Sequence, residues 1–187
     1  MLVIVTSPVD VNIPDSDAAL PAGITRADFF SGCYRISADV PTGDRRLLDV
    51  LRDATRHYLE VRRMRVSPVD GDAQAVGYSD GLLTKAEIDW LAVRAEPSRA
   101  ESRLYGFVKK APVRVAVVLD RHRVEGNVFV ESIATDPTLY FLRGADKSTE
   151  RFLALASATV TSVAGGTEEV GLVIVNRTAI KAFSVLR

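Results

Sequence analysis

Alternating apolar and polar residues run along much of the chain, and this is the pattern of half-buried β-strands. HYLEVRRMRVSPVDG (57–71) and ERFLALASATVTSVAGG (150–166) both alternate, and both end at a glycine-containing turn. RVAVVL (114–119) is short and rich in β-branched residues, and HRVEGNVFV (122–130) follows after the residue pair 120–121. These patterns predict long strands and a hairpin.

Two segments follow a helical pattern instead. RRLLDVLRDA (45–54) places its leucines on one face and follows Asp44, which we expect to be the N-cap. In TDPTLYFLRGA (135–145), Asp136 and Pro137 suit the cap and the first turn. We therefore expect one short helix in each half of the chain.

A polar pair interrupts the last strand pattern in each half. VGYSDGLLTKAEIDWLAV (76–93) breaks at Thr84-Lys85, and EEVGLVIVNRTAIKAFSVL (168–186) breaks at Asn176-Arg177. A strand that bends in this way commonly passes to another sheet or closes a small barrel. The predicted fold class is mainly β (α+β): two tandem small barrel-like or sandwich-like units, each with about four or five antiparallel strands and one short helix.

The two halves also repeat one another in sequence. VNRTAI (175–180) lies 92 positions after LTKAEI (83–88), and HRVEGNV (122–128) lies 88 positions after YRISADV (34–40). Further collinear matches are 51–54 with 142–145, 58–61 with 152–155, and 67–71 with 161–165. The offset drifts only from 88 through 91 and 94 to 92, so short gaps in loops suffice. We interpret this as a tandem duplication packed about a pseudo-two-fold axis.

The repeat sets the predicted boundaries. These are an N-terminal extension at 1–23, β repeat unit 1 at 24–95, a linker at 96–110 and β repeat unit 2 at 111–187. The linker is charged and has a proline near each end. A unit this small buries little apolar surface alone, which gives a physical motive for a second copy.

Charge and cysteine content limit the expected binding partners and the expected cellular compartment. Basic and acidic residues number 24 each, so no net field draws the chain to nucleic acid or to a membrane, and electrostatic binding must be local. The single cysteine, Cys33, excludes an internal disulfide, and we expect a reducing, cytoplasmic setting. The start has neither a basic segment nor a long apolar run, and no uncharged apolar stretch of about 18 residues occurs, so no membrane partner is expected.

The strand, RRLLDVLRD (45–53) and a long hairpin ending in VNRTAI (175–180) resemble an uncharacterised bacterial family of small β domains. That family has an Arg-Leu-Ser-Asp-x-Leu-Asn stretch and a Val-Asn-Lys-x-x-Ile close, and each half of this chain keeps one of the two. The resemblance implies no activity. The predicted strand order and polar kink also resemble those of Sm-like small barrels. This similarity of shape implies no function.

Groups for catalysis are sparse in the sequence. His57 and His122 occupy non-equivalent places and are interpreted as surface or half-buried histidines, and Cys33 has no nearby base that would form a thiolate. Asp70 and Asp72, with Asp80 beyond them, form a D-G-D turn that lacks the other oxygen ligands of a calcium loop. The Gly165-Gly166 pair is expected in a hairpin turn rather than in a phosphate-binding loop. We expect no catalytic residue, no metal and no cofactor.

Arginines distinguish the two repeats. Repeat 1 carries arginines where repeat 2 has Ala156, Ser157 and Thr159. The predicted anion-binding residues are Arg45, Arg46, Arg52, Arg56, Arg62, Arg63 and Arg65. They suit a phosphate, a nucleic acid or an acidic partner. The favoured alternative is a solvated strand edge that charge protects from aggregation.

The leading interpretation is a non-catalytic binding or assembly module, with homo-oligomers or a protein partner and no membrane. A nucleic acid is a less favoured partner, because only Tyr58 offers a stacking platform near the arginines. The third hypothesis is an enzyme with a cleft between the repeats. Its predicted cleft residues are His57, Tyr58, Asp80 and Trp90.

Overall fold

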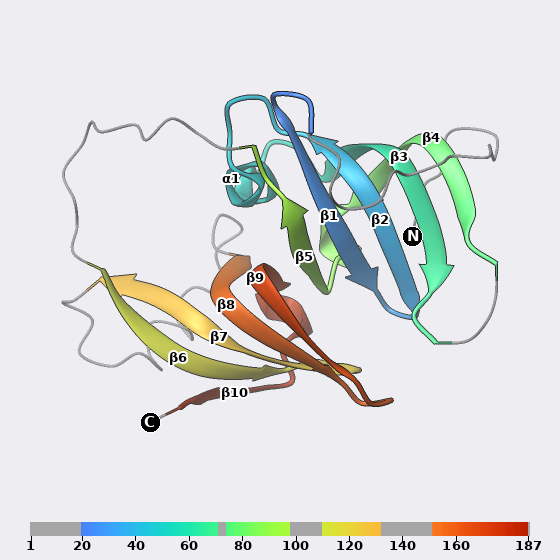
Figure 1. The fold of residues 1–187 in the computed structure, drawn as a ribbon. Helices are drawn as coiled ribbons and strands as arrows, with labels where there is room; N and C mark the ends of the chain where they lie inside the picture. The colour runs from blue at the N-terminus through green and yellow to red at the C-terminus, as the bar shows by residue number, and fades with distance from the viewer. Residues whose placement is uncertain (1–19, 71–73, 98–109, 132–150, 187) are drawn as a thin grey trace. The chain divides into compact units, whose positions relative to one another are not determined.

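The computed structural model describes residues 20–70, 74–97, 110–131 and 151–186, which are mainly antiparallel β-strand, as predicted (Figure 1). The chain divides into two compact units, Met1–Pro97 and Ser98–Arg187. This division falls inside the stretch that the sequence predicts to be a linker. Each unit is described by itself below.

Unit 1 is a five-stranded sheet with one short helix. Its strands lie in the order β5-β1-β2-β3-β4. The elements are β1 Ile24–Ser31, β2 Tyr34–Pro41, α1 Leu47–Arg52, β3 Tyr58–Pro68, β4 Val76–Thr84, the 3-10 turn η1 Lys85–Glu87 and β5 Trp90–Ala95. The predicted kink at Thr84-Lys85 is the start of η1, and the chain after it crosses the unit to pair with β1.

Unit 2 has the same strand order, β10-β6-β7-β8-β9, with β6 in the place of β1. Its described elements are β6 Lys110–Val118, β7 His122–Glu131, β8 Phe152–Ser162, β9 Thr167–Asn176, the 3-10 turn η3 Arg177–Ala179 and β10 Ala182–Val185. Gly165 and Gly166 have φ of 100° and 95° in the turn between β8 and β9, as the hairpin prediction requires. The helix predicted at 135–145 lies outside the described residues.

The strand register is shared as well as the order. Corresponding pairs are Arg26↔Asp39 with Arg114↔Asn127 (offsets 88 and 88), Tyr58↔Thr84 with Phe152↔Asn176 (94 and 92), and Phe29↔Leu91 with Val117↔Phe183 (88 and 92). The offsets are those found in the sequence alone. The internal pairing of both units therefore follows one scheme.

Both units also carry a β-bulge at the same place. Arg63 in β3 and Ser157 in β8 are the two described non-glycine residues with positive φ, at 47° and 48°. The ladder to the preceding strand shifts register beside each of them. Since the two positions differ by 94, the bulge belongs to the shared scheme.

The apolar core of each unit lies on one face of its sheet. Fully buried members are Phe29, Ile36, Leu59, Val61, Leu83 and Leu91 in unit 1, and Val115, Val117, Val124, Leu155, Val173 and Val175 in unit 2. In unit 1 the helix adds Leu47 and Leu51, which are 1% and 3% exposed. Burial alternates along β3, as the sequence pattern predicted, whereas β1 is buried at every position from Thr25 to Phe30.

Two details of the prediction were wrong. The N-cap residue of α1 is Arg46 rather than Asp44, and the N–H of Leu47 instead donates to Oε1 of Glu96 at 3.2 Å. The expected closed barrel is also absent, because β4 and β5 stand at opposite ends of the order within unit 1 and no described pairing joins them. Each sheet is open.

Candidate functional site

Two buried aspartates lie on the face of the unit 1 sheet that points away from the core. Asp28 and Asp39 are 4% and 2% exposed, and they alternate with the core residues Phe29 and Ala38. A buried carboxylate is costly unless it is paired. The sequence signal was present but missed: an aspartate stands inside each of two strands whose neighbouring residues are apolar.

Arginines clamp Asp39 from two sides. Arg26 donates from Nε to Oδ1 at 2.9 Å, and its side chain is only 7% exposed. Arg63 donates from Nη2 to Oδ2, and its guanidinium is partly exposed. The left-handed backbone at Arg63 belongs to the bulge, so the bulge and the ion pair occur together.

Asp28 forms a second clamp. Arg35 donates to Oδ2 at 2.7 Å, and Arg94 donates to the same oxygen at 2.6 Å. The Ser37 hydroxyl donates to Oδ1 at 2.5 Å. Burial by itself would raise the pKa of Asp28, but the Ser37 hydrogen bond and the charges of Arg35 and Arg94 outweigh it and lower the pKa below 3.8.

Two arginines of β3, Arg62 and Arg65, lie beside these clamps and take no part in them. Arg62 and Arg65 are exposed and point to the same face as Asp39 and Ser37, their cross-strand partners. In the described part of the chain, neither makes a hydrogen bond or an ion pair. The extra bulge residue between them makes them successive positions on that face, about 7 Å apart along the strand.

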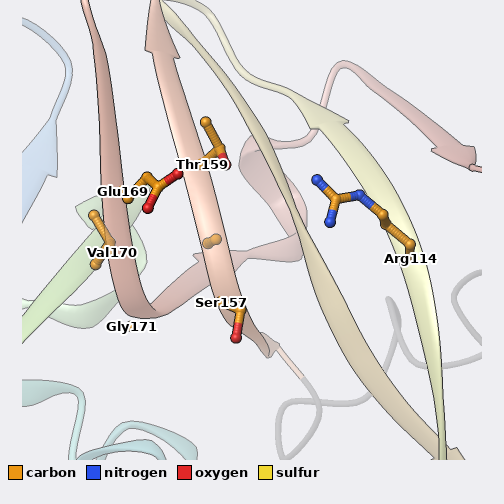
Figure 2. A pocket seen from close by; sticks show the side chains of 7 residues that line it. Arg114, Ser157, Thr159, Glu169, Val170 and Gly171 are labelled. Atoms are coloured by element: carbon orange, nitrogen blue, oxygen red, sulfur yellow. The ribbon is translucent and has the colours of Figure 1, made fainter.

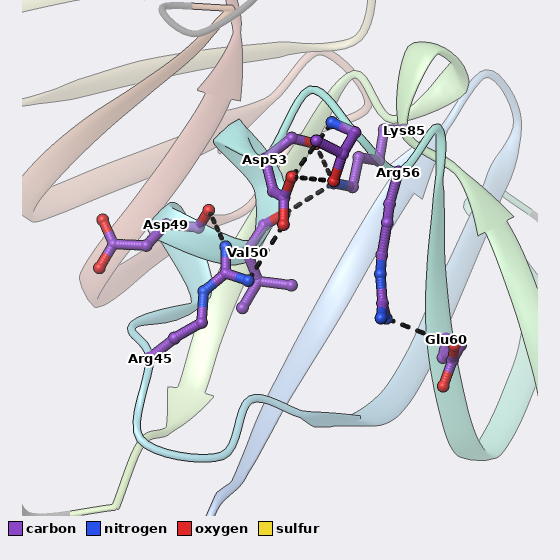
Figure 3. Close-up of polar contacts among 8 residues, drawn as sticks. Arg45, Asp49, Val50, Asp53, Arg56, Glu60 and Lys85 are labelled. Atoms are coloured by element: carbon purple, nitrogen blue, oxygen red, sulfur yellow. Dashed lines mark hydrogen bonds and ion pairs between the residues drawn. The ribbon is translucent and has the colours of Figure 1, made fainter.

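The helix arginines form a separate group, which Figure 3 shows around the end of α1. Arg45 pairs with Asp53 at 3.0 Å and donates to the Asp49 carbonyl at 2.9 Å. The hydroxyl of Thr55, together with Arg45, holds the pKa of Asp53 well below its usual range. Arg46 is the N-cap residue of α1, and Arg52 is its last residue.

Lys85 is the buried cation of this group. It is 5% exposed, and Nζ donates to the carbonyl oxygens of Val50 and Asp53 at 2.7 and 2.9 Å, at the carboxyl end of α1 (Figure 3). Burial lowers the pKa of Lys85, and the charge of Asp53 opposes that change. The geometry is that of a helix C-cap.

The predicted arginine set is therefore divided by the sheet. α1 contributes leucines to the core side, whereas Arg62 and Arg65 stand on the other side. Arg56 is bound locally, to Glu60 at 3.6 Å. The strand-edge interpretation was also wrong, because β3 pairs with β2 and with β4 and so lies inside the sheet.

The residues predicted for a cleft take different places within unit 1. Trp90 is 3% exposed and stacks on Phe30 with ring centroids 3.8 Å apart. His57 and Tyr58 are exposed at the start of β3, and Asp80 on β4 lies opposite Arg62. The cleft hypothesis stays a prediction.

The other predicted sites have these positions. Cys33 is an exposed free thiol in the turn between β1 and β2. His122, which was expected at the surface or half-buried, is 8% exposed, and both burial and the charge of Arg121 lower its pKa. Asp70 is exposed at the end of β3, and Asp72 lies outside the described residues. Over the described ranges, no three His, Cys, Asp or Glu side chains gather as metal ligands.

Unit 2 has an open hollow of about 410 Å³ at its bulge, here called the unit 2 hollow (Figure 2). It is lined by Arg114, Ser157, Ala158, Thr159, Glu169, Val170 and Gly171. Figure 2 shows the Arg114 guanidinium directed from β6 toward β8 and the Glu169 carboxylate beside Thr159. Arg114 and Ser157 in this lining correspond to Arg26 and Arg63, the two arginines that bind Asp39 in unit 1.

Among the described helices, none is long and apolar enough to cross a membrane. Comparison of the chain with protein-family models, curated proteins and solved structures gives no match.

Proposed function

We propose that the chain is a non-catalytic binding or assembly module made of two diverged copies of one five-stranded unit. In this proposal unit 1 binds an acidic surface of a protein partner through its arginine face, defined as the exposed side chains of Tyr58, Arg62 and Arg65 on β3.

Four features support the duplication. The two units share strand order, register offsets and the position of the bulge. A cationic residue is also buried at the start of the 3-10 turn in both, Lys85 in η1 and Arg177 in η3, which are 92 positions apart. Independent origins would have to reproduce each of these features separately.

The binding proposal rests on the absence of ion pairs at Arg62 and Arg65 in the described part of the chain. The neighbouring Arg26, Arg35, Arg63 and Arg94 are all engaged by Asp28 or Asp39. Arg62 and Arg65 have no such contact in the described part of the chain, and they sit on an interior strand whose backbone is paired on both sides. Two guanidinium groups on a rigid backbone can bind carboxylates with little loss of backbone entropy.

A protein partner suits this face better than a nucleic acid does. Glu60 and Asp80 are exposed close to Arg62 and would repel a phosphate backbone, whereas a folded protein surface presents mixed charge. Arginine and tyrosine are also enriched at protein interfaces. Tyr58 is 48% exposed on the same side of β3 as Arg62.

The test uses a fluorescent glutamate-rich peptide and, in parallel, a single-stranded oligonucleotide of equal charge. We expect the double variant Arg62→Glu and Arg65→Glu to bind the peptide at least about tenfold more weakly, because attraction becomes repulsion. The matched control, Arg121→Glu with Arg123→Glu, makes the same charge change at exposed arginines of unit 2 and should bind as the unaltered chain does.

Thermal unfolding followed by circular dichroism checks that both double variants fold. Equal loss of peptide binding in the two variants would show a net-charge effect and contradict the proposal. Tighter binding of the oligonucleotide than of the peptide would instead favour the nucleic-acid hypothesis.

A further inference from the structure

The unit 2 hollow lies where unit 1 holds one of its clamps. By the shared register, Arg114 corresponds to Arg26, and Asn127 corresponds to Asp39. The bulge residue Ser157 corresponds to Arg63. In unit 1 this place is therefore filled by a carboxylate and a guanidinium that bind each other.

Unit 2 has lost both of these groups and kept the third. Asn127 carries no charge, and the short Ser157 side chain, exposed at the bulge, does not reach across the strand as Arg63 does. Arg114 is retained, and its side chain is 52% exposed. Its ion pair with Glu125 is long, at 3.7 Å, and Glu125 also pairs with Arg123 at 2.6 Å. The guanidinium of Arg114 thus lacks the close carboxylate that Arg26 has.

A carboxylate stands on the opposite side of the hollow. Glu169 pairs across the ladder with Thr159, where unit 1 has Gly77 opposite Arg65. Within the described ranges Glu169 makes no hydrogen bond or ion pair. The hydroxyl groups of Ser157 and Thr159 line the space between Glu169 and Arg114 (Figure 2). The lining therefore offers a cation and an anion, with hydroxyl groups between them.

We propose that the unit 2 hollow binds a free amino acid that has a cationic side chain. Its carboxylate pairs with Arg114, as Asp39 pairs with Arg26, and its cationic group takes the place of the Arg63 guanidinium and pairs with Glu169. A volume of about 410 Å³ falls near the lower end of the range for small-molecule sites, which suits a ligand of this size. This site is separate from the arginine face of unit 1.

Gly171 provides a way to close the site without disturbing the fold. Its φ is outside the left-handed region, and a Cβ added there would meet no atom within 4 Å. A valine at this position therefore projects into open space beside Ser157. The matched position in unit 1 is Ser79, which is likewise skipped in the β3–β4 ladder.

The experiment titrates the full chain with L-arginine, which carries a carboxylate and a guanidinium, and follows amide shifts in proton–nitrogen correlation spectra. We expect saturable shifts at Ser157, Thr159 and Gly171. Agmatine, which lacks the carboxylate, and L-norvaline, which lacks the guanidinium, should bind at least about tenfold more weakly. Arg114→Gln and Gly171→Val should lose binding by a similar factor, and Ser79→Val should retain it.

Glu169→Gln tests the contact with the cationic group of the ligand alone. This variant should lose the preference for L-arginine over L-norvaline. The absence of saturable shifts in the unaltered chain would overturn the proposal. Binding that persists unchanged in Gly171→Val, while its spectrum remains folded, would overturn it as well.

Discussion

Asp39 and Asn127 hold the same register position in the two units, and of the two only Asp39 has the carboxylate around which a clamp forms. Asp39 is enclosed by Arg26 and Arg63, while Asn127 faces the unit 2 hollow side of its sheet. The sequence shows such a carboxylate only as an aspartate between apolar residues of a strand. Its partners come from other strands and cannot be assigned before the register is known.

At the residue scale, Asp39→Asn should lower the free energy of unfolding by about 3 kcal/mol, because two guanidinium groups lose a buried counter-ion. Arg63 is partly exposed and can turn to water, which limits the loss. Urea unfolding measures the effect. Asp120→Asn, at a carboxylate that is 75% exposed, is the control and should change stability by less than about 0.5 kcal/mol.

Asp28 should make stability depend on pH at the acid end. Its pKa is lower in the folded chain than in the unfolded chain, so its contribution is complete above the unfolded pKa of about 4 and is lost as the pH falls through the folded pKa. Urea unfolding should therefore show that the free energy of unfolding falls between pH 6 and pH 2.5, and that it falls less in Asp28→Asn than in the unaltered chain. Identical pH profiles for the two proteins would contradict this role.

At the element scale, α1 is only six residues long and is held at both ends by side chains from elsewhere. Glu96 accepts from its first N–H, and Lys85 donates to its last carbonyls. A helix this short is unstable alone, so these contacts and its buried leucines must maintain it. The leucine pattern predicted the helix, but neither cap could be predicted, because both are far away in sequence.

Lys85→Met should destabilise unit 1 by about 1 to 3 kcal/mol, because the carbonyl oxygens of Val50 and Asp53 lose their buried donor. The control is Lys181→Met, since Lys181 is exposed and makes only a surface ion pair with Asp120 at 3.3 Å. Chemical unfolding compares the two. A loss no larger than that of the control would show that Lys85 is not a functional cap.

At the scale of the whole molecule, the division between Met1–Pro97 and Ser98–Arg187 predicts that the parts can fold separately. Each has its own core and a complete strand order. We expect chains covering 1–97 and 98–187, expressed separately, each to show dispersed amide spectra and a cooperative thermal transition. A non-cooperative transition in either part would contradict this independence.

The sequence by itself determined the alternating strands, the two polar kinks and the repeat offsets, because alternation and turn residues are local signals. Only the tertiary structure decided that β3 is an interior strand, that the predicted arginines fall on two sides of the sheet, and that the two bulges coincide. It also decided which arginines are neutralised and where unit 2 is hollow. Those features depend on which strands pair and in which register, and pairing between strands is long-range in sequence.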